Sequence, residues 1–358
     1  MLKRFLQGFV RLFGTKVHDC KYGENPQQKG AALHRNRSWR FWRRDPLALH
    51  RFKILLGQPS YNNFTDLDRA LQTMTHIAAG FAVNFEDRVP NIAIGIKHGN
   101  ACGASFSFTM RGEALAKMAI GNSRALFGGL VMTNFPLNEE SIDILLTSGL
   151  VGGQRRVLDS VVCPEISREA LLMLHRKKEK CRVICNPALS QLGRDSIDRE
   201  QRSRSVRGGK LVQDNYEYVL DFQDERVKRL GPSFDIDVKK DILFAWAIGC
   251  TSTSNTITVV KKRMLIGNGV GQQDRVTAAR LALKLANEMR HDTSASVAYS
   301  DSFFPFEDAP LELIDAGVNT IFTSSGSMGD KKVIALCDER MVALCMVPDE
   351  VGRGFYGH

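Results

Sequence analysis

A lysine and a histidine stand side by side where a buried strand is predicted to end. Residues 91–96 form an apolar run typical of such a strand, and Lys97 and His98 follow it directly, before a glycine-containing segment at 99–103. Reactive side chains of α/β proteins lie where strands end, because the backbone leaves the sheet there and faces a crevice. Imidazole gains and loses a proton near neutral pH, so the pair predicts proton transfer at a loop. A Lys-His pair standing alone is more often a solvated loop, so the prediction depends on other segments.

Length and composition indicate a soluble protein of two domains. The chain has 358 residues, of which 43% are hydrophobic and 25% charged, as in globular proteins. No apolar run approaches the ~20 residues that a membrane span requires. The eight cysteines include no CxxC pair and lie mostly in apolar runs. This usage indicates reduced, buried thiols, a cytoplasmic location and no structural zinc site.

Short basic segments contribute to a net charge of +10. Residues 35–44 interleave cations with aromatic side chains, as single-strand nucleic-acid binders do, and residues 199–210 form a second basic run. Both are flanked by acids and lack a recognition-fold signature, which favours a solvated face or a channel for an anionic small molecule. Nucleic-acid binding through 35–44 stays an alternative. Residues 1–14 are basic and amphipathic without the features of a secretory signal, and indicate a surface or docking helix.

Hydrophobic periodicity predicts alternating helices and strands in both halves of the chain. In the first half the predicted helices are 65–82, 113–120, 139–147 and 167–177, and the strands are 91–96, 128–132, 157–163 and 182–185. In the second half the helices are 238–248, 272–289, 310–316 and 331–338, and the strands are 256–261, 295–300, 318–323 and 341–347. The polar stretch 190–209 predicts a domain boundary. The glycine run 267–271 reads GxGxG, which argues against a dinucleotide site.

Seven separated segments resemble, in order, one family: the transformylases of 5-aminoimidazole-4-carboxamide ribonucleotide (AICAR). This family is the formyl-transferring half of the bifunctional purine biosynthesis protein. The similar segments are 21–28 (KYGENPQQ), 60–66 (SYNNFTD), 97–103 (KHGNACG), 254–255 (SN), 267–275 (GNGVGQQDR), 300–308 (SDSFFPFED) and 325–327 (SGS). One match could arise by chance, whereas seven in register over nearly the whole chain do not.

The resemblance implies an architecture as well as an activity. It implies an α/β protein of two duplicated three-layer α/β/α domains with a cytidine-deaminase-like fold. We expect a basic lead at 1–20, a first domain at 21–205 and a second at 206–358, with a homodimer that shares its active sites between subunits. Bifunctional members carry a cyclohydrolase domain before this region, and 20 residues leave no room for it. Ring closure is therefore not expected here, and a separate cyclohydrolase would supply it.

The implied reaction moves a formyl group from 10-formyltetrahydrofolate, a cosubstrate, to the 5-amino group of AICAR. This weakly nucleophilic amine loses a proton as it attacks, so a positioned base is required, and the resemblance assigns that role to His98. Lys97 would stabilise negative charge or assist departure of the folate nitrogen. Asn255, in a loop before a predicted strand, would hold the formyl oxygen as charge develops on it.

Binding roles carry over from the matching positions. The expected nucleotide-binding residues are Lys21, Tyr22, Asn63, Gly128, Arg275 and Arg353. Arg275 opens a predicted helix, where its charge and the free N–H groups both favour an anion. Phe303 and Asp308 match side chains that face the pterin ring of the folate. Both ligands are anionic, which gives the basic balance of the chain a purpose.

Some members of the family hold a monovalent cation such as K+ near the SN loop. The matching oxygens in this chain belong to Ser252, Ser254, Thr256 and Asp301. The His-x-Glu and Pro-Cys-x-x-Cys zinc signature of deaminases is absent from the sequence, which argues against zinc hydrolysis.

The chain also departs from the family pattern. Lys21 replaces an arginine and gives up its bidentate fork, Gln27 replaces a histidine, and Ala101 replaces a proline in the Lys-His segment. The chain ends RGFYGH where the family is closer to RxFxH, so His358 falls one residue out of register. These departures leave open an alternative function, a paralogue that binds the nucleotide without transferring formyl groups.

Overall fold

The computed structural model describes residues 15–35, 45–175 and 180–356. The expected helix at 1–14, most of the basic segment 35–44 and His358 lie outside these ranges, and so does the end of the helix expected at 167–177. Among the described residues, no helix is both long and apolar enough to cross a membrane.

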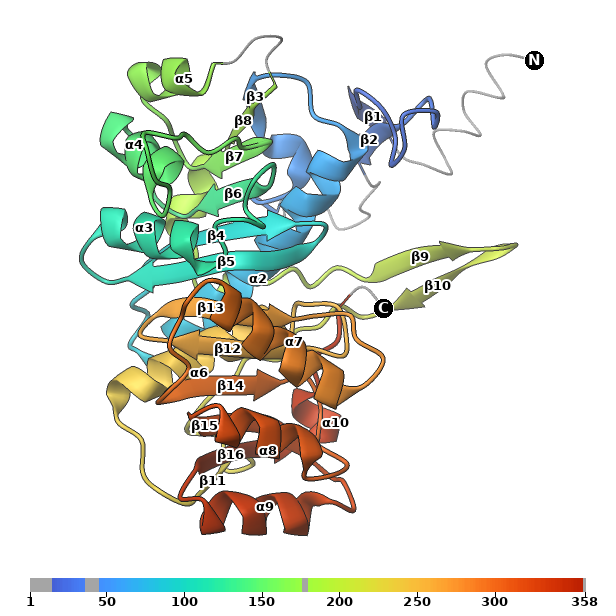
Figure 1. The fold of residues 1–358 in the computed structure, drawn as a ribbon. Coiled ribbons are helices and arrows are strands. Elements are labelled where there is room, and N and C mark those ends of the chain that lie inside the picture. Colours follow the sequence, from blue (N-terminus) through green and yellow to red (C-terminus); the bar gives the residue numbers. More distant parts are fainter. Residues whose placement is uncertain (1–14, 36–44, 176–179, 357–358) are drawn as a thin grey trace.

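A single twelve-stranded mixed sheet runs through the molecule (Figure 1). Listed from one edge to the other, its strands are β11 (Lys228–Leu230), β16 (Ala343–Pro348), β15 (Val318–Ser325), β14 (Ser296–Ser300), β12 (Ile257–Lys261), β13 (Met264–Gly269), β5 (Asn100–Ser107), β4 (Asn91–Lys97), β6 (Leu130–Thr133), β7 (Ser160–Cys163), β8 (Arg182–Cys185) and β3 (Lys53–Leu56). The expectation of an α/β fold is confirmed.

The two halves of the sheet repeat one another in strand order and direction. From edge to centre the first half runs β3-β8-β7-β6-β4-β5 and the second runs β11-β16-β15-β14-β12-β13. In each half the edge strand is antiparallel, the next three strands are parallel, and the two inner strands form an antiparallel hairpin. Strands β5 and β13 join the halves by one antiparallel bridge. A duplication would produce this repeat; the duplication itself stays a prediction.

Helices cover both faces of the sheet. On one face α2 (Tyr61–Asn84) and α6 (Ile236–Gly249) pack together and share one apolar core with strands of both halves. On the other face each half has its own core beneath its own helices (Figure 1). These helices are α3 (Arg111–Gly121), α4 (Glu139–Thr147) and α5 (Arg168–Leu174) in the first half, and α7 (Arg275–Glu288), α8 (Asp308–Asp315) and α9 (Asp330–Glu339) in the second.

Local sequence explains how these elements begin and pack. Ser60 and Asn63 form a reciprocal capping box that satisfies free N–H groups at the start of α2. In β5 the glycine at 103 lies against α3, where a Cβ would meet the carbonyl oxygen of Met118 at 2.3 Å. In β13 the glycine at 269 lies against α7 in the same way, 2.0 Å from the carbonyl oxygen of Ala278. Glycine is therefore required there for close helix–strand approach.

The structure corrects the sequence reading at two glycine-rich segments. All the helices and strands predicted from periodicity are present within a few residues of the expected bounds, apart from the end at 176–177 that is not described. However, the segment at 99–103, expected to be a loop, lies largely in strand β5, and the segment at 267–271, where no strand was expected, lies largely in strand β13. Alternating glycines removed the apolar pattern by which a strand is recognised.

The segment predicted to be a linker is structured. It holds the 3-10 turns η3 (Pro187–Gln191) and η4 (Arg194–Ser196), followed by strand β9 (Arg202–Val206), which pairs with β10 (Gly209–Gln213). This exposed hairpin projects from the body between the two halves (Figure 1). The expected domain boundary at 205/206 falls within β9, and the division into domains stays a prediction. The remaining elements are β1 (Thr15–Asp19), β2 (Ala32–Arg35), η1 (Leu49–Arg51) and α10 (Asp349–Gly352).

Candidate functional site

One end of the sheet gathers most of the predicted site residues. In the first half this end holds the end of β4 and the starts of β6 and β7. In the second half, strand directions place the start of β12 and the ends of β14, β15 and β16 at the same end. Topology therefore carries Lys97 and His98 to the same side of the molecule as Asn255 and Phe303.

Lys97 and His98 stand on a tight hairpin turn between β4 and β5. Lys97 pairs with Asn100, and the two residues between them have positive φ angles, 52° at His98 and 75° at Gly99. Two such residues are the mark of a type I′ turn, whose twist matches that of the flanking strands. Histidine is one of the few residues besides glycine that is enriched in this conformation. The expected loop is thus a defined turn.

Helix α2 holds this turn from below by two side chains. The backbone N–H of Gly99 donates to Oδ1 of Asp66 at 2.7 Å, and Nε of Arg69 donates to the Gly99 carbonyl oxygen at 2.9 Å. Asp66 and Arg69 are three residues apart, which puts them on one face of the helix. Burial raises the pKa of Asp66, while the Gly99 N–H and the nearby His98 lower it. Both polar groups of one turn residue are therefore fixed by α2.

The two candidate catalytic side chains differ in their surroundings. Nζ of Lys97 donates to the carbonyl oxygen of Phe127 at 2.7 Å, a neutral partner that leaves the charge of the ammonium group unpaired among the described residues. His98 is exposed. The arrangement presents an imidazole to solvent beside a cation that no carboxylate of the described part of the chain neutralises.

The loop that carries Asn255 lies against the same turn. Oδ1 of Asn100 accepts a hydrogen bond from the backbone N–H of Thr253 at 3.0 Å. Nδ2 of Asn255 donates to the carbonyl oxygen of Gln272 at 2.9 Å, and the peptide bond before Asn255 is cis. An amide nitrogen carries two N–H groups, so one donor of Asn255 is left for a ligand. The structure thus brings the three residues of the predicted catalytic set to adjoining segments.

Four of the expected nucleotide-binding residues lie at the start of α2 and of the neighbouring strands. The segment carrying Lys21 and Tyr22 runs along the start of α2, where the Tyr61 N–H donates to the Tyr22 carbonyl oxygen at 3.1 Å. Asn63 is buried, and its Nδ2 donates to Oγ of Ser160 at 3.2 Å. Gly128 has a φ of 71° and open space where a Cβ would be. They share the end of the sheet that holds His98.

The side chain of Arg275 forms an ion pair within the protein. It is the first residue of α7, as predicted, but its guanidinium donates to Oδ1 of Asp301 at 3.1 Å rather than facing an open helix end. Burial raises the pKa of Asp301 to about 6, against the lowering effect of Arg275. Burial also lowers the pKa of Arg275. An anion at this helix end stays a prediction, and it would have to compete with Asp301.

The ion pair of Arg275 with Asp301 also affects whether the SN loop can bind a cation. Of the four expected oxygens only Asp301 carries charge, and it is already paired with Arg275 and with the backbone N–H of Thr256. The hydroxyls of Ser252 and Thr256 donate to backbone carbonyls at 2.8 and 2.7 Å. A monovalent cation at these oxygens stays a prediction, and it would meet a carboxylate that is already paired with a guanidinium.

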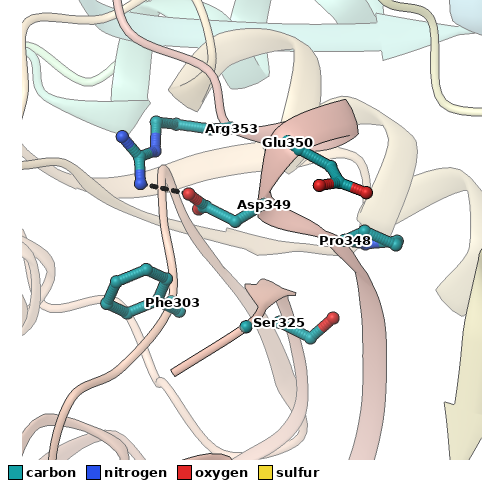
Figure 2. A pocket seen from close by; sticks show the side chains of 7 residues that line it. Phe303, Ser325, Pro348, Asp349, Glu350 and Arg353 are labelled. Carbon is teal, nitrogen blue, oxygen red and sulfur yellow. Dashed lines mark ion pairs between the residues drawn. The ribbon is translucent and has the colours of Figure 1, made fainter. Parts of the chain in front are cut away.

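A cavity of about 660 Å³ opens at the ends of β15 and β16. Figure 2 shows the side chains that line it. Phe303 lies on one side, and Arg353 forms an ion pair with Asp349 on the other. The guanidinium carbon of Arg353 lies 5.9 Å from the centre of the Phe303 ring. Asp349 also accepts from Oγ of Ser302 at 2.9 Å. The remaining lining residues are Ser325, Gly326, Pro348 and Glu350.

The cavity separates the two residues expected to face a pterin. Phe303 lines it, whereas Asp308 is exposed at the start of α8 and is not among the lining residues. Asp349 was missed by the sequence reading. Burial raises its pKa, but hydrogen bonds from Arg353, Ser324 and Ser302 outweigh burial and leave it lowered, so a carboxylate faces the cavity. An Asp four residues before an Arg was the available signal.

Comparisons with known proteins point to one family and to relatives that share one name. The family described as AICARFT/IMPCHase bienzyme matches residues 3–285. The chain is 34% identical over 339 residues to the bifunctional purine biosynthesis protein PurH of Rhodopirellula baltica, covering 94% of this chain and 58% of that protein. It is 32% identical to PurH of Chlorobium phaeobacteroides over 346 residues, with the same two shares, and 31% identical to PurH of Trichodesmium erythraeum over 329 residues, 92% and 56%. The chain thus spans less than two thirds of the length of these relatives.

Proposed function

The chain belongs to the AICARFT/IMPCHase bienzyme family, and from this premise we propose that it transfers a formyl group from 10-formyltetrahydrofolate to the 5-amino group of AICAR. The role would lie in purine biosynthesis, as the names of the relatives indicate for those proteins. One observation carries the proposal. A hairpin turn presents Lys97 and His98 next to the loop of Asn255, at one end of the sheet.

Formyl transfer needs a base, and the turn supplies one. As the amine nitrogen of AICAR bonds to the formyl carbon, one of its protons must leave, and the exposed imidazole of His98 receives it. The bond between the formyl carbon and N10 of the folate then breaks, and that nitrogen takes up a proton as it departs. Asp66 and Arg69 fix the backbone of the turn, so the base is held in place before the substrate arrives.

Charge that develops on the formyl oxygen needs donors. The second N–H of the Asn255 side chain is available for this oxygen, because the first is committed to Gln272. Lys97 adds a positive charge without a carboxylate partner in the described structure. The hydrogen bond from Asn255 and the attraction to Lys97 would both strengthen when bound substrates exclude water, because the effective dielectric constant falls.

We propose that the nucleotide and the folate bind in two neighbouring regions of the candidate site. The nucleotide would lie near Asn63 and Gly128, where open space and a positive φ angle allow close approach to the backbone. The folate would take the cavity lined by Phe303, whose ring offers a stacking surface. We propose a homodimer that shares its active sites.

The decisive test is formyl transfer measured by release of tetrahydrofolate. We expect turnover in the wild type and a loss of at least ~100-fold in His98→Ala, the usual scale for a positioned base. The matched control is Lys262→Ala, which changes an exposed residue of positive φ in the equivalent turn of the second half. This control is expected to keep wild-type turnover.

The same experiment separates the enzyme from a nucleotide-binding paralogue. The replacements at Lys21 and Gln27 and the altered C-terminal segment are the observations in favour of the paralogue. AICAR binding by calorimetry, with no formyl product from a folded wild type, would establish the paralogue and overturn the proposed activity. Equal turnover in the wild type and in His98→Ala would remove His98 from its role.

A further inference from the structure

The last described residues of the chain run from the cavity to Arg69, the α2 residue that hydrogen-bonds the turn carrying His98. Arg353 stands at the cavity, and the next residue, Gly354, donates its backbone N–H to the carbonyl oxygen of Asp301 at 3.1 Å. A Cβ on Gly354 would meet Cβ of Cys250 at 2.3 Å, so the chain passes close against the core. Two residues later the ring of Tyr356 is 5% exposed. This tail spans the two regions of the candidate site.

Tyr356 is enclosed by two arginines. The guanidinium carbon of Arg69 lies 4.0 Å from the centre of its ring, and that of Arg202 lies 4.2 Å from it. Distances this short are those of direct cation–π contact. Arg202, at the base of the β9–β10 hairpin, also pairs with Asp68 at 3.1 Å. The ring therefore holds together α2, the hairpin and the tail.

Arg69 connects this cluster to the catalytic turn. Its Nε donates to the Gly99 carbonyl oxygen, and Gly99 directly follows His98. Burial lowers the pKa of Arg69 to about 10, with a further lowering from Arg202, so two like charges stand close together in a partly buried place. The ring of Tyr356 offers both cations a negative face. Without the ring, repulsion between the guanidiniums would move Arg69.

We propose that Tyr356 acts through Arg69 as a positioning residue that fixes the Gly99 carbonyl and thereby the orientation of His98. The contact is made by the aromatic face, since the buried Tyr356 hydroxyl has no hydrogen-bond partner among residues 15–35, 45–175 and 180–356. The tail thus links the occupancy of the cavity, through Arg353, to the geometry of the base. This inference rests on the proposed function for its catalytic consequence, but its structural content concerns only His98.

The first measurement follows the histidine directly, by NMR of protein labelled with ¹³C at histidine side chains. His98→Gln identifies the His98 signal by its disappearance. In Tyr356→Ala we expect the His98 signal to shift and broaden, while the signal of His76, fully buried in the core, stays in place. Tyr356→Phe keeps the ring and is expected to match the wild type. An unchanged His98 signal in Tyr356→Ala would overturn the proposal.

The second measurement uses formyl transfer. Tyr356→Ala is expected to lower kcat about tenfold or more while KM for AICAR changes less than about twofold, because misplacement of a catalytic group by ~1 Å costs on this scale. Tyr356→Phe should restore kcat. A loss confined to KM, or a loss in Tyr356→Phe equal to that in Tyr356→Ala, would contradict a positioning role.

A folding defect is separated by a second variant. If urea unfolding shows that Tyr356→Ala does not fold, Arg69→Lys keeps a charge at the same place but loses the planar group that stacks and donates. The same shift of the His98 signal is expected there. The NMR result is obtained whether or not the wild type transfers formyl groups, so absence of turnover would reject the proposed function alone.

Discussion

The two halves of the sheet each end their inner strands in a two-residue turn, and the two turns share one backbone design. In the β4–β5 turn, His98 and Gly99 have positive φ angles; in the β12–β13 turn, Lys262 and Arg263 do, at 48° and 69°. In both, an aspartate of the helix below accepts the N–H of the second turn residue. Asp66 of α2 accepts from Gly99 at 2.7 Å, and Asp241 of α6 accepts from Arg263 at 2.8 Å.

The side chains of the two turns are used in different ways. In the second turn Lys261 pairs with Asp292 at 2.6 Å, and Arg263 pairs with Glu113 at 3.0 Å. Lys261 and the neighbouring Ser294 hold the pKa of Asp292 well below its usual range. In the first turn the one hydrogen-bond partner of Lys97 among the described residues is a carbonyl oxygen, and His98 is exposed. The same backbone conformation therefore serves two purposes. The β12–β13 turn forms ion pairs that include one with the first half of the sheet, whereas the β4–β5 turn leaves Lys97 and His98 without an ion-pair partner in the described structure.

This difference supports a functional assignment that rests on neighbours rather than on residue type. A lysine stands at the end of the inner strand in both halves, at 97 and at 261, so a lysine there is not informative by itself. The absence of a carboxylate partner around Lys97 in the described structure is informative, because its ammonium charge stays available to an anionic ligand.

The largest expected effect comes from exchanging the equivalent lysines for methionine. Lys97→Met should lower formyl transfer at least ~100-fold, the usual cost of removing a group that stabilises charge in the transition state. Lys261→Met should keep wild-type turnover and lower the urea midpoint slightly, because its ion pair is partly exposed. Steady-state kinetics and urea unfolding of both variants check this pair. Equal losses of activity would remove the distinction between the turns.

A smaller effect is expected from the equivalent aspartates, through pH. Burial raises the pKa of Asp241 from its ordinary value of 3.8 to about 6. Between these values the folded protein binds a proton that the unfolded chain does not. The free energy of unfolding therefore rises as pH falls from 6 to 4, and above pH 6 the buried charge of Asp241 destabilises the fold. Asp241→Asn should therefore be more stable than the wild type at pH 7, by on the order of 2 kcal/mol, with no difference below about pH 4.

The matching change at Asp66 tests the comparison. Burial raises its pKa too, so Asp66→Asn should not be less stable than the wild type at pH 7. Its turn carries the base, however, and we expect formyl transfer to fall about tenfold because the turn loses a charged anchor. Asp241→Asn should keep its activity. Urea midpoints between pH 4 and 7, with turnover at pH 7, give all four results; a loss of stability in Asp241→Asn at pH 7 would contradict the account.

Periodicity predicted most of the fold because apolar faces repeat with the period of the element they belong to. The long helix α2 and the strand β4 follow this rule, with Ile92, Ile94 and Ile96 all facing the core shared with α2. It failed at β5 and β13, whose glycines are required by the close approach of α3 and α7, a tertiary demand that no local pattern records. The β9–β10 hairpin was missed because its exposed polar sequence resembles a linker.

The candidate site could be predicted only in part for a related reason. Spacing and resemblance pointed to Lys97, His98 and Asn255, and the structure brings their segments together. The residues that hold the turn were not identified, although Asp66 lies inside one of the resembling segments, because a supporting role depends on what a side chain touches. The same holds for Asn100 and Asp349, whose hydrogen bonds join segments far apart in the sequence.

The smallest effect concerns backbone strain at the first position of each turn. His98 and Lys262 both adopt the left-handed region, where asparagine is better tolerated than most residues. His98→Asn and Lys262→Asn should each raise the free energy of unfolding by less than about 1 kcal/mol. Urea unfolding at one pH measures both, and turnover should be lost in the first variant alone.

The two asparagine variants are most informative when their free energies of unfolding are compared with their turnover. If His98→Asn gains stability while losing turnover, the first turn retains a residue that its backbone accepts less readily than asparagine, as expected where a side chain is kept for the site rather than for the fold. If Lys262→Asn gains a similar amount of stability at no cost in turnover, the residue at this position of the second turn is not needed for activity. The two turns then share only their backbone conformation. A loss of stability in His98→Asn would instead show that the imidazole supports the fold, which would contradict the contrast between the turns.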